Sequence, residues 1–241
     1  MPRSGRRTAS LLPKQHIDHL FTGSETIRDV VIGMADGLNV PFVLASGVSG
    51  AIASTHIVVT AGLAEIAAGA ISMGLAGFIA AKDDAKHYHR ELQREELKGP
   101  DLPGREALKI GELFKDYGVT ADEAVSVVAA LHRKPRAWRT FMMRFDLGMK
   151  TPDPKQPMRS AATIAGSYVV CGMIPLLPYM QLENVDEALL YSVVVTLVAL
   201  AMFGAVKGHF TRVSKIRCAW QTALVGSVAA GVAFGIARVI S

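Results

Sequence analysis

Long apolar runs alternate with polar stretches along the chain and predict its architecture. A helix needs ~20 apolar residues to cross a bilayer. The runs of about this length are 30–48, 57–81, 160–182, 188–206 and 218–237. A charged stretch, 82–159, separates the second run from the third. We therefore expect an all-α polytopic membrane protein with five transmembrane helices and a helical insertion between spans 2 and 3.

The same pattern divides the chain into segments. They are a polar N-terminal segment (1–26), transmembrane helices 1 and 2 (27–81), the insertion (82–159) and transmembrane helices 3 to 5 (160–241). The first residues are basic but are not followed by an apolar core of signal-peptide length. We therefore expect the first span itself to direct membrane insertion.

The insertion carries the start and stop signals of short helices. The helix of the second span is expected to continue to Lys98, where glycine and proline follow. A second helix is expected over 105–117. A third begins after Thr120, where Glu123 completes a capping box, and a fourth covers 135–148.

Composition and charge placement predict the orientation. Half of the 241 residues are hydrophobic and mean hydropathy is +0.29, which suits a helical membrane protein. All but one of the 26 Lys and Arg lie before span 1, in the insertion or between spans 4 and 5. The positive-inside rule then predicts a cytosolic N-terminus and a cytosolic insertion. Since topology accounts for the net charge of +5, we expect no nucleic-acid partner.

Each of the first two spans contains one carboxylate inside its apolar run, Asp36 and Glu65. A charged side chain at the centre of a bilayer costs at least ~2.5 kcal/mol, so these acids should face a partner or a hydrated pathway. In an antiparallel hairpin, Met73 would lie at a depth similar to that of Asp36. Oxygen and thioether ligands together favour a divalent transition metal, and binding it would displace protons. The alternative is a pair of structural, hydrogen-bonded acids and a methionine that fills the core.

The insertion and the N-terminal segment contain weaker candidates. One helix face carries Asp84, His87, Glu91 and Glu95. This face could pass a cation towards the membrane, but a solvated face interleaved with basic residues is the more economical interpretation. Met142 and Asp146, at i and i+4, could form a soft and hard ligand pair. His16 and His19 could bind a metal or be solvated.

Sequence motifs for catalysis are missing. The chain has no phosphate-binding glycine loop, no H-E-x-x-H, no G-x-S-x-G and no Cys-x-x-Cys. A membrane-tethered ferroxidase would need paired Glu-x-x-His ligands, which the insertion does not supply. Cys171 and Cys218 lie in apolar spans, where a thiol is most often a small buried hydrophobe, so we expect neither a disulfide nor a zinc site. We expect a protein that is not an enzyme and holds no permanently bound cofactor.

Several long runs, in order, resemble one known family. They are DVVIGMADGLNVPFVLASGVSG, AEIAAGAISMGLAGFIAAK, HRELQREE, FMMRFDLGMKTPDP and GMIPLLPY. They look like the vacuolar iron transporter family, and the likeness extends from about residue 25 to the C-terminus. The resemblance implies a homodimer with five spans per subunit that moves Fe²⁺, and often Mn²⁺, out of the cytosol in exchange for protons. It also implies that the insertion is a cytosolic domain that captures metal.

Matching motifs carry the family's pathway residues onto this chain. They are Asp36 in ADGLNVP, Glu65 in AEIAAG and Met73 in ISMG. In the insertion, the family's pattern has glutamates at Glu95, Lys98, Glu106 and Lys109, then methionine at Met142 and glutamate at Asp146. The ligands implied there are therefore Glu95, Glu106, Met142 and Asp146. Because two expected acids are lysines, we expect fewer or weaker metal sites in the insertion.

These observations lead to one expected function and one alternative. The expected function is a proton-coupled antiporter that exports Fe²⁺, with Mn²⁺, Co²⁺ and Zn²⁺ as further candidate substrates. It would lie in the vacuolar membrane of a eukaryotic cell, or otherwise in the cell membrane. The alternative is a membrane-anchored metal-sensing or scaffold protein without transport. Flux of metal in sealed vesicles separates the two.

Overall fold

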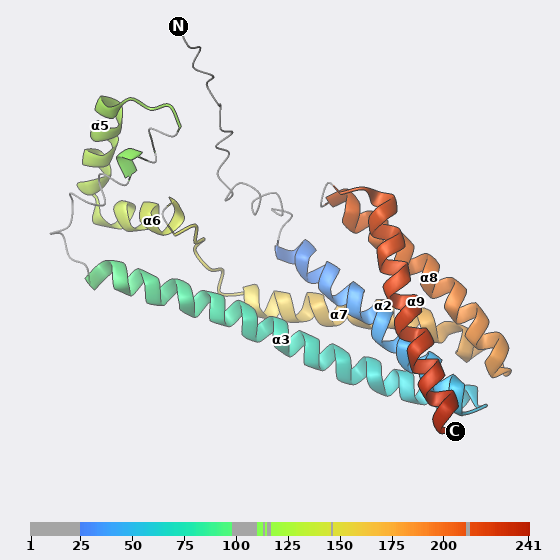
Figure 1. Ribbon diagram of the computed structural model, residues 1–241. Coiled ribbons are helices and arrows are strands. Elements are labelled where there is room, and N and C mark those ends of the chain that lie inside the picture. Colours follow the sequence, from blue (N-terminus) through green and yellow to red (C-terminus); the bar gives the residue numbers. More distant parts are fainter. Residues whose placement is uncertain (1–24, 98–109, 113, 115–116, 146, 211–212) are drawn as a thin grey trace, which may run out of the picture. The chain divides into compact units, whose positions relative to one another are not determined.

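The secondary structure of the described residues is entirely helical (Figure 1). The computed structural model describes residues 25–97, 110–112, 114, 117–145, 147–210 and 213–241. Its helices are α2 (Glu25–Ala51), α3 (Thr55–Leu97), α5 (Ala121–His132), α6 (Pro135–Phe145), α7 (Gln156–Gln181), α8 (Val185–Phe210) and α9 (Lys215–Ile240).

Five of these helices are long and apolar enough to span a membrane: α2, α3, α7, α8 and α9. Each contains one of the apolar runs seen in the sequence, so the all-α fold with five candidate spans is confirmed. The expected continuation of the second span is also confirmed as far as Leu97, because α3 is a single helix of 43 residues. It is therefore much longer than the ~20 residues that cross a bilayer.

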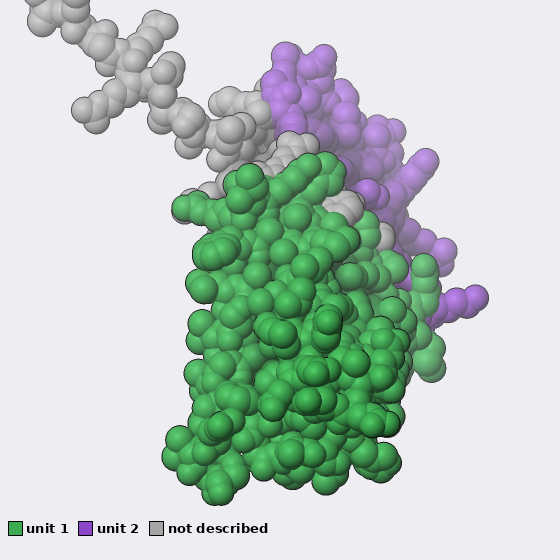
Figure 2. All heavy atoms as spheres, turned by 90° about the vertical axis from the view of Figure 1, so that its right-hand side faces the viewer, with its two compact units in different colours: residues 1–78, 158–241 green, residues 79–157 purple. Residues whose placement is uncertain are grey.

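The chain divides into two compact units, which Figure 2 colours separately. One unit comprises residues 1–78 and 158–241, and the other comprises residues 79–157. In the first unit, α8 packs on α9, and α2 packs on both. Gly204 allows the close approach of α8 to α9, since a Cβ there would lie 2.6 Å from the carbonyl oxygen of Cys218.

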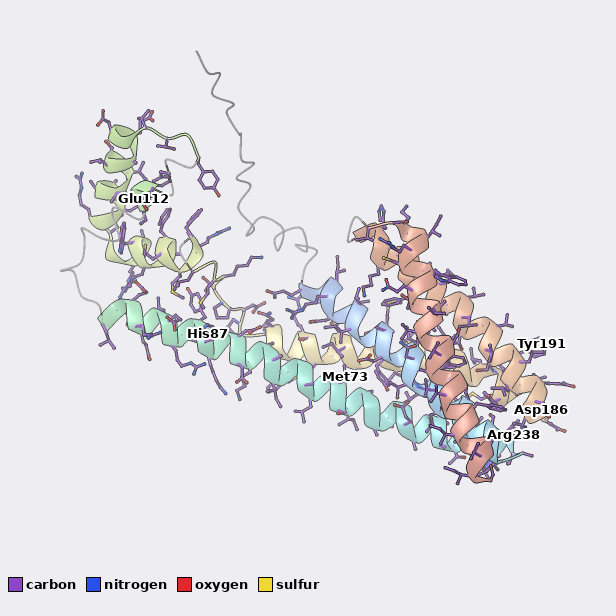
Figure 3. All side chains as sticks on the ribbon, viewed as in Figure 1. Met73, His87, Glu112, Asp186, Tyr191 and Arg238 are labelled. Carbon is purple, nitrogen blue, oxygen red and sulfur yellow. The ribbon has the colours of Figure 1, made fainter. Side chains whose placement is uncertain are left out.

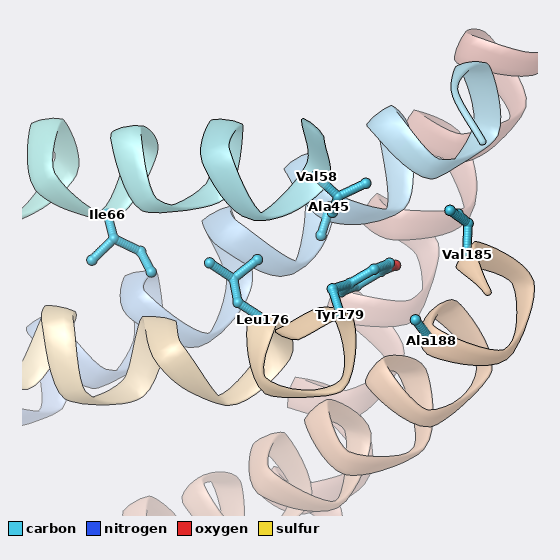
Figure 4. Close-up of a cluster of buried hydrophobic side chains, with 7 residues drawn as sticks. All are labelled: Ala45, Val58, Ile66, Leu176, Tyr179, Val185 and Ala188. Atoms are coloured by element: carbon cyan, nitrogen blue, oxygen red, sulfur yellow. The ribbon is translucent and has the colours of Figure 1, made fainter. Parts of the chain in front are cut away.

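A buried cluster joins four helices of the first unit (Figure 4). Its members are Ala45, Val58, Ile66, Leu176, Tyr179, Val185 and Ala188, from α2, α3, α7 and α8. In a bilayer, close packing of this kind stabilises helix association, because lipid tails are as apolar as the side chains themselves. The cluster therefore stabilises the helix contacts through van der Waals packing rather than through the exclusion of water.

The second unit has a small hydrophobic core. Ile110, Val128 and Met142 are buried there, with Phe114, Trp138 and Phe141 packed against them. The capping box expected at Thr120 is present: Glu123 accepts hydrogen bonds from the Thr120 N–H at 3.0 Å and from its hydroxyl at 2.6 Å. These bonds lower the pKa of the Glu123 carboxyl.

The other expected helix limits in the insertion are close to the observed ones. Gly118, which directly follows the expected 105–117 helix, has a φ of +82°, a conformation common for a glycine just after a helix end. Residues 110–112 and 114 are helical, whereas most of the expected 105–117 helix lies outside the described residues. The last helix begins at Pro135 as expected but ends at Phe145, three residues before Gly148.

Candidate functional site

Glycines let α2 approach the backbone of α7 closely. A Cβ at Gly37 of α2 would lie 2.5 Å from the carbonyl oxygen of Tyr168 on α7. One turn earlier, a Cβ at Gly33 would meet the hydroxyl of Ser167 and the backbone of Ile164. Only glycine permits contacts of this kind between two helix backbones. Asp36 therefore lies on α2 between two positions where that helix touches α7.

A second set of glycines fits α3 against side chains of α7. A Cβ at Gly69 would lie 2.5 Å from the Cζ atom of the Tyr168 ring. A Cβ at Gly62 would similarly meet the side chain of Leu176. The Tyr168 ring thus fills the space that Gly69 leaves open. Tyr168 is 2% exposed and contacts α2 through its backbone and α3 through its ring.

Two levels of contact define the register of the three helices. At one level, Pro41 of α2 and Ile66 of α3 both lie against Gly172 of α7. At the other level, Gly33 of α2 lies against the backbone of Ile164 on α7. The side chain of Ile164 would meet a Cβ at Gly77 of α3.

Between these two levels lie Asp36 on α2 and the α3 segment that carries Met73. Both side chains are partly buried within the single chain. Figure 3 labels Met73 on α3. Glu65 lies directly before Ile66, at the N-terminal end of this α3 segment. It is about 12 Å from Met73 along the helix axis, at 1.5 Å per residue. The three residues are thus distributed along the helices rather than gathered at one point.

Glu65 has two differently placed oxygen atoms. Its Oε1 accepts a 2.5 Å hydrogen bond from the hydroxyl of Tyr168. Its Oε2 is buried and has no hydrogen-bond partner in the part of the chain that the structure describes. A buried carboxylate oxygen without a partner is costly. Of the two Glu65 oxygens, Oε2 is therefore the one available to bind a cation or a proton.

A different arrangement holds the buried acid Asp29, near the start of α2. Its carboxylate pairs with the guanidinium of Arg28 at 3.4 Å. The charge of Asp29 therefore has a partner within the chain. Glu65 differs from Asp29, because its carboxylate accepts a hydrogen bond from a neutral hydroxyl, that of Tyr168.

Within the described residues of one chain, no group of three His, Cys, Asp or Glu side chains is close enough to hold a metal ion. Among the residues predicted to line the pathway, Asp36, Glu65 and Met73 offer two carboxylates and a thioether. A cation at either acid would need further ligands, such as water or groups from another chain.

The candidate ligands in the insertion lie in different surroundings. Met142 is 2% exposed and belongs to the core cluster with Ile110 and Val128. Glu95 is partly buried on α3. Glu106 and Asp146 lie outside the described residues, as do His16 and His19. The packing of Met142 is that of a core residue.

The acidic face of α3 resembles a solvated helix surface. Asp84 and His87 are exposed, and Glu91 pairs with Arg94 at 3.2 Å. On the same helix, Lys86 pairs with Asp83 at 3.0 Å. Exposed pairs at this spacing are common on helices and contribute little stability. These contacts favour the solvated interpretation of this face.

A comparison with known proteins places the chain in a family. A model of the VIT family matches residues 27–238. The chain belongs to the VIT family. It is 51% identical over 230 residues to Vacuolar iron transporter 2 of Oryza sativa subsp. japonica, covering 95% of this chain and 94% of that protein. It is 50% identical over 225 residues to Vacuolar iron transporter 1 of Arabidopsis thaliana, covering 93% and 90%. It is also 36% identical over 227 residues to Protein CCC1 of Saccharomyces cerevisiae, covering 89% and 69%.

Sequence reasoning did not identify Tyr168 as a site residue of this VIT family protein. One signal was available, because Tyr168 lies near the middle of the third apolar run, away from the interfaces where membrane tyrosines gather. A tyrosine at that depth needs a hydrogen-bond partner. The sequence does not indicate which acid provides it, since Glu65 is 103 residues away.

Proposed function

We propose that this VIT family protein is a proton-coupled transporter that moves ferrous iron out of the cytosol into a vacuole-like lumen. The observation that carries the proposal is the Glu65 carboxylate, which lies in a candidate membrane helix with Oε2 buried and without a partner among the described residues. Relatives at about 50% identity are named vacuolar iron transporters, which supports iron as the cargo and the vacuolar membrane as the location.

The donor chemistry agrees with this cargo. Carboxylate oxygens bind Fe²⁺ and Mn²⁺, and the thioether of Met73 favours transition metals over Mg²⁺ and Ca²⁺. Mn²⁺, Co²⁺ and Zn²⁺ are therefore further candidate substrates. In this proposal, Asp36 and Met73 receive the cation at one depth, and Glu65 receives it about two turns from Met73 along α3.

Proton exchange follows from the same carboxylates. A carboxylate must lose its proton to bind a metal, so the arrival of a cation at Glu65 displaces a proton. When the cation leaves, protonation neutralises a buried charge that is costly in a membrane. Metal and proton occupancy therefore exclude each other at Oε2, which is the requirement for an antiporter.

The charge distribution at the helix ends supports the proposed orientation. Lys207 near the end of α8 and Lys215 at the start of α9 lie at one end of the first unit. Figure 3 shows Asp186, Tyr191 and Arg238 at the opposite end. With the basic end in the cytosol, the N-terminus and the insertion are cytosolic as well.

A second copy of the chain would complete the site. The described residues of one chain supply too few ligands for a metal, and α3 exposes Ile71 (73%) and Leu75 (56%) together with small residues beside them. Small residues allow two membrane helices to pack closely. We propose a homodimer in which α3 meets its copy and the acids of both chains share a cation.

Metal capture by the insertion is proposed to be weak. Lysines occupy positions 98 and 109, where the family pattern has acids, and Met142 is enclosed in a core. The full-length chain with Asp36→Ala and Glu65→Ala isolates whatever binding the insertion retains. Several tight Fe²⁺ or Mn²⁺ sites in that variant would contradict weak capture.

Uptake into proteoliposomes tests the transport proposal. We expect Fe²⁺ uptake that depends on an imposed pH gradient and moves protons the opposite way. Asp36→Ala and Glu65→Ala should each abolish it. Glu183→Ala, in the exposed loop between α7 and α8, is the matched control and should retain uptake. Metal binding without flux by the wild-type protein would instead identify a sensor or scaffold.

A further inference from the structure

Three helices hold the Tyr168 hydroxyl in place. The backbone of Tyr168 lies against Gly37 of α2, and the ring lies against Gly69 of α3. The residue is 2% exposed, so its ring has little room to turn away. A hydroxyl fixed in this way can determine the geometry of its acceptor, since buried groups lose little entropy when their surroundings already hold them.

The acceptor is one oxygen of Glu65. Tyr168 donates to Oε1 at 2.5 Å, whereas Oε2 is buried without a partner among the described residues. A hydrogen bond to an ionised carboxylate is stronger than one between neutral groups. A cation that uses both oxygens of Glu65 would have to compete with this bond. A cation that uses Oε2 alone would leave it intact.

Divalent cations differ in how they use carboxylates. Ca²⁺ takes 6–8 oxygen ligands in flexible geometry and commonly binds both oxygens of one carboxylate. Transition metals bind sites of fewer, mixed ligands and accept a thioether. A glutamate limited to one oxygen is therefore a poor ligand for Ca²⁺ and an adequate one for Fe²⁺.

We propose that Tyr168 determines metal specificity by restricting Glu65 to coordination through Oε2. Tyr168 is a positioning residue in this account, because it touches the carboxylate and not the cation. The inference rests on the proposed role of Glu65 as a ligand for transported metal. It adds the prediction that selectivity against Ca²⁺ depends on a residue with no direct contact to the metal.

Removing the hydroxyl tests the proposal. Tyr168→Phe frees Oε1, so Ca²⁺ should compete with Fe²⁺ about tenfold more effectively than in the wild-type protein. Equilibrium binding of Fe²⁺ to the purified full-length protein, titrated with Ca²⁺ under anaerobic conditions, measures this directly. Uptake with the same competitor then gives the effects on KM and maximal rate separately. The selectivity change should appear in binding and in KM.

Two further variants distinguish specificity from general damage. Gly69→Ala keeps the hydroxyl but displaces the ring, and it should weaken Ca²⁺ exclusion in the same direction. Tyr179→Phe removes the hydroxyl of another buried tyrosine on α7 and should leave the Fe²⁺ to Ca²⁺ ratio unchanged. Gly69→Ala also provides the test if Tyr168→Phe does not fold.

The outcomes separate this inference from the proposed transport. An unchanged Fe²⁺ to Ca²⁺ ratio in Tyr168→Phe and Gly69→Ala overturns the role of Tyr168, even if both variants transport iron. A changed binding ratio supports the role even if the wild-type protein shows no flux, which would refute transport alone. Wild-type protein that binds no Fe²⁺ at a site sensitive to Glu65→Ala overturns both.

Discussion

Ser49 on α2 donates a 3.0 Å hydrogen bond to the phenol oxygen of Tyr179 on α7. On α2, Ser49 lies about three and a half turns beyond Asp36, towards the C-terminal end of the helix. Around this bond lies the hydrophobic cluster that includes Ala45 and Leu176. The pair therefore joins α2 to α7 through neutral groups.

Loss of this bond should affect stability rather than transport. Tyr179→Phe keeps the ring and removes a hydroxyl that is hydrogen-bonded to both Ser49 and Ser192, so we expect a loss of about 1–3 kcal/mol, at roughly 0.5–1.5 kcal/mol for each bond. Unfolding in mixed micelles measures the stability, and Fe²⁺ uptake measures the function. A large fall in uptake without a fall in stability would show that Tyr179 takes part in transport.

The glycine contacts between α2 and α7 should be intolerant of side chains. Gly37→Ala places a Cβ 2.5 Å from a backbone carbonyl of α7, which cannot move aside like a flexible side chain. We expect a loss of stability of roughly 1–3 kcal/mol or failure to fold. Gly166→Ala on α7 is the matched control, because a Cβ at that position would meet no neighbouring described residue within 4 Å. Thermal unfolding should separate the two variants, and equal stability would refute the close contact.

The α5 capping box should depend on pH. Hydrogen bonds from Thr120 lower the pKa of Glu123 in the folded protein. A lowered folded pKa means that the stabilisation is present above the unfolded pKa, near 4.5, and is lost as pH falls through the folded value. Amide hydrogen exchange in α5 should accelerate below that range beyond the intrinsic pH effect. Glu123→Gln should remove this pH dependence, and an unchanged profile in the variant would count against the box.

Two substitutions at Met142 separate packing from metal binding. Met142→Leu preserves volume and should cost less than ~1.5 kcal/mol, whereas Met142→Ala leaves a cavity and should cost about 2–5 kcal/mol. The burial of Met142 in the core of the insertion leads us to expect unchanged Fe²⁺ binding in Met142→Leu. Metal titration of the full-length variant tests this. Weaker binding with normal stability would establish the thioether as a ligand.

The parts of the fold that sequence predicted are those encoded locally. Apolar length predicted the five spans, and the spacing of Thr120 and Glu123 predicted a cap, because neither depends on distant residues. The pairing of Tyr168 with Glu65 depends on how α3 and α7 are rotated about their axes. Small residues occur on several faces of α3, so the sequence does not determine which face meets α7.

The candidate site shows the same division. The carboxylates of Asp36 and Glu65 were visible from sequence because an acid in an apolar run is conspicuous. Met142 was ambiguous, since i,i+4 spacing with Asp146 fits a ligand pair and also fits the stripe of Trp138 and Phe141 that forms the core. The burial of Met142 in the folded unit favours the core interpretation, which the spacing of residues alone cannot distinguish from a ligand pair.

The backbone contact between α2 and α7 also limits how the protein can change shape. At Gly37 the backbone of Tyr168 faces α2 directly, so no side chain there could change its rotamer to let one helix slide past the other. In the proposed transporter, we expect α2 and α7 to move as one rigid body. The hinges of that motion then belong to the connections of this helix pair with the rest of the bundle.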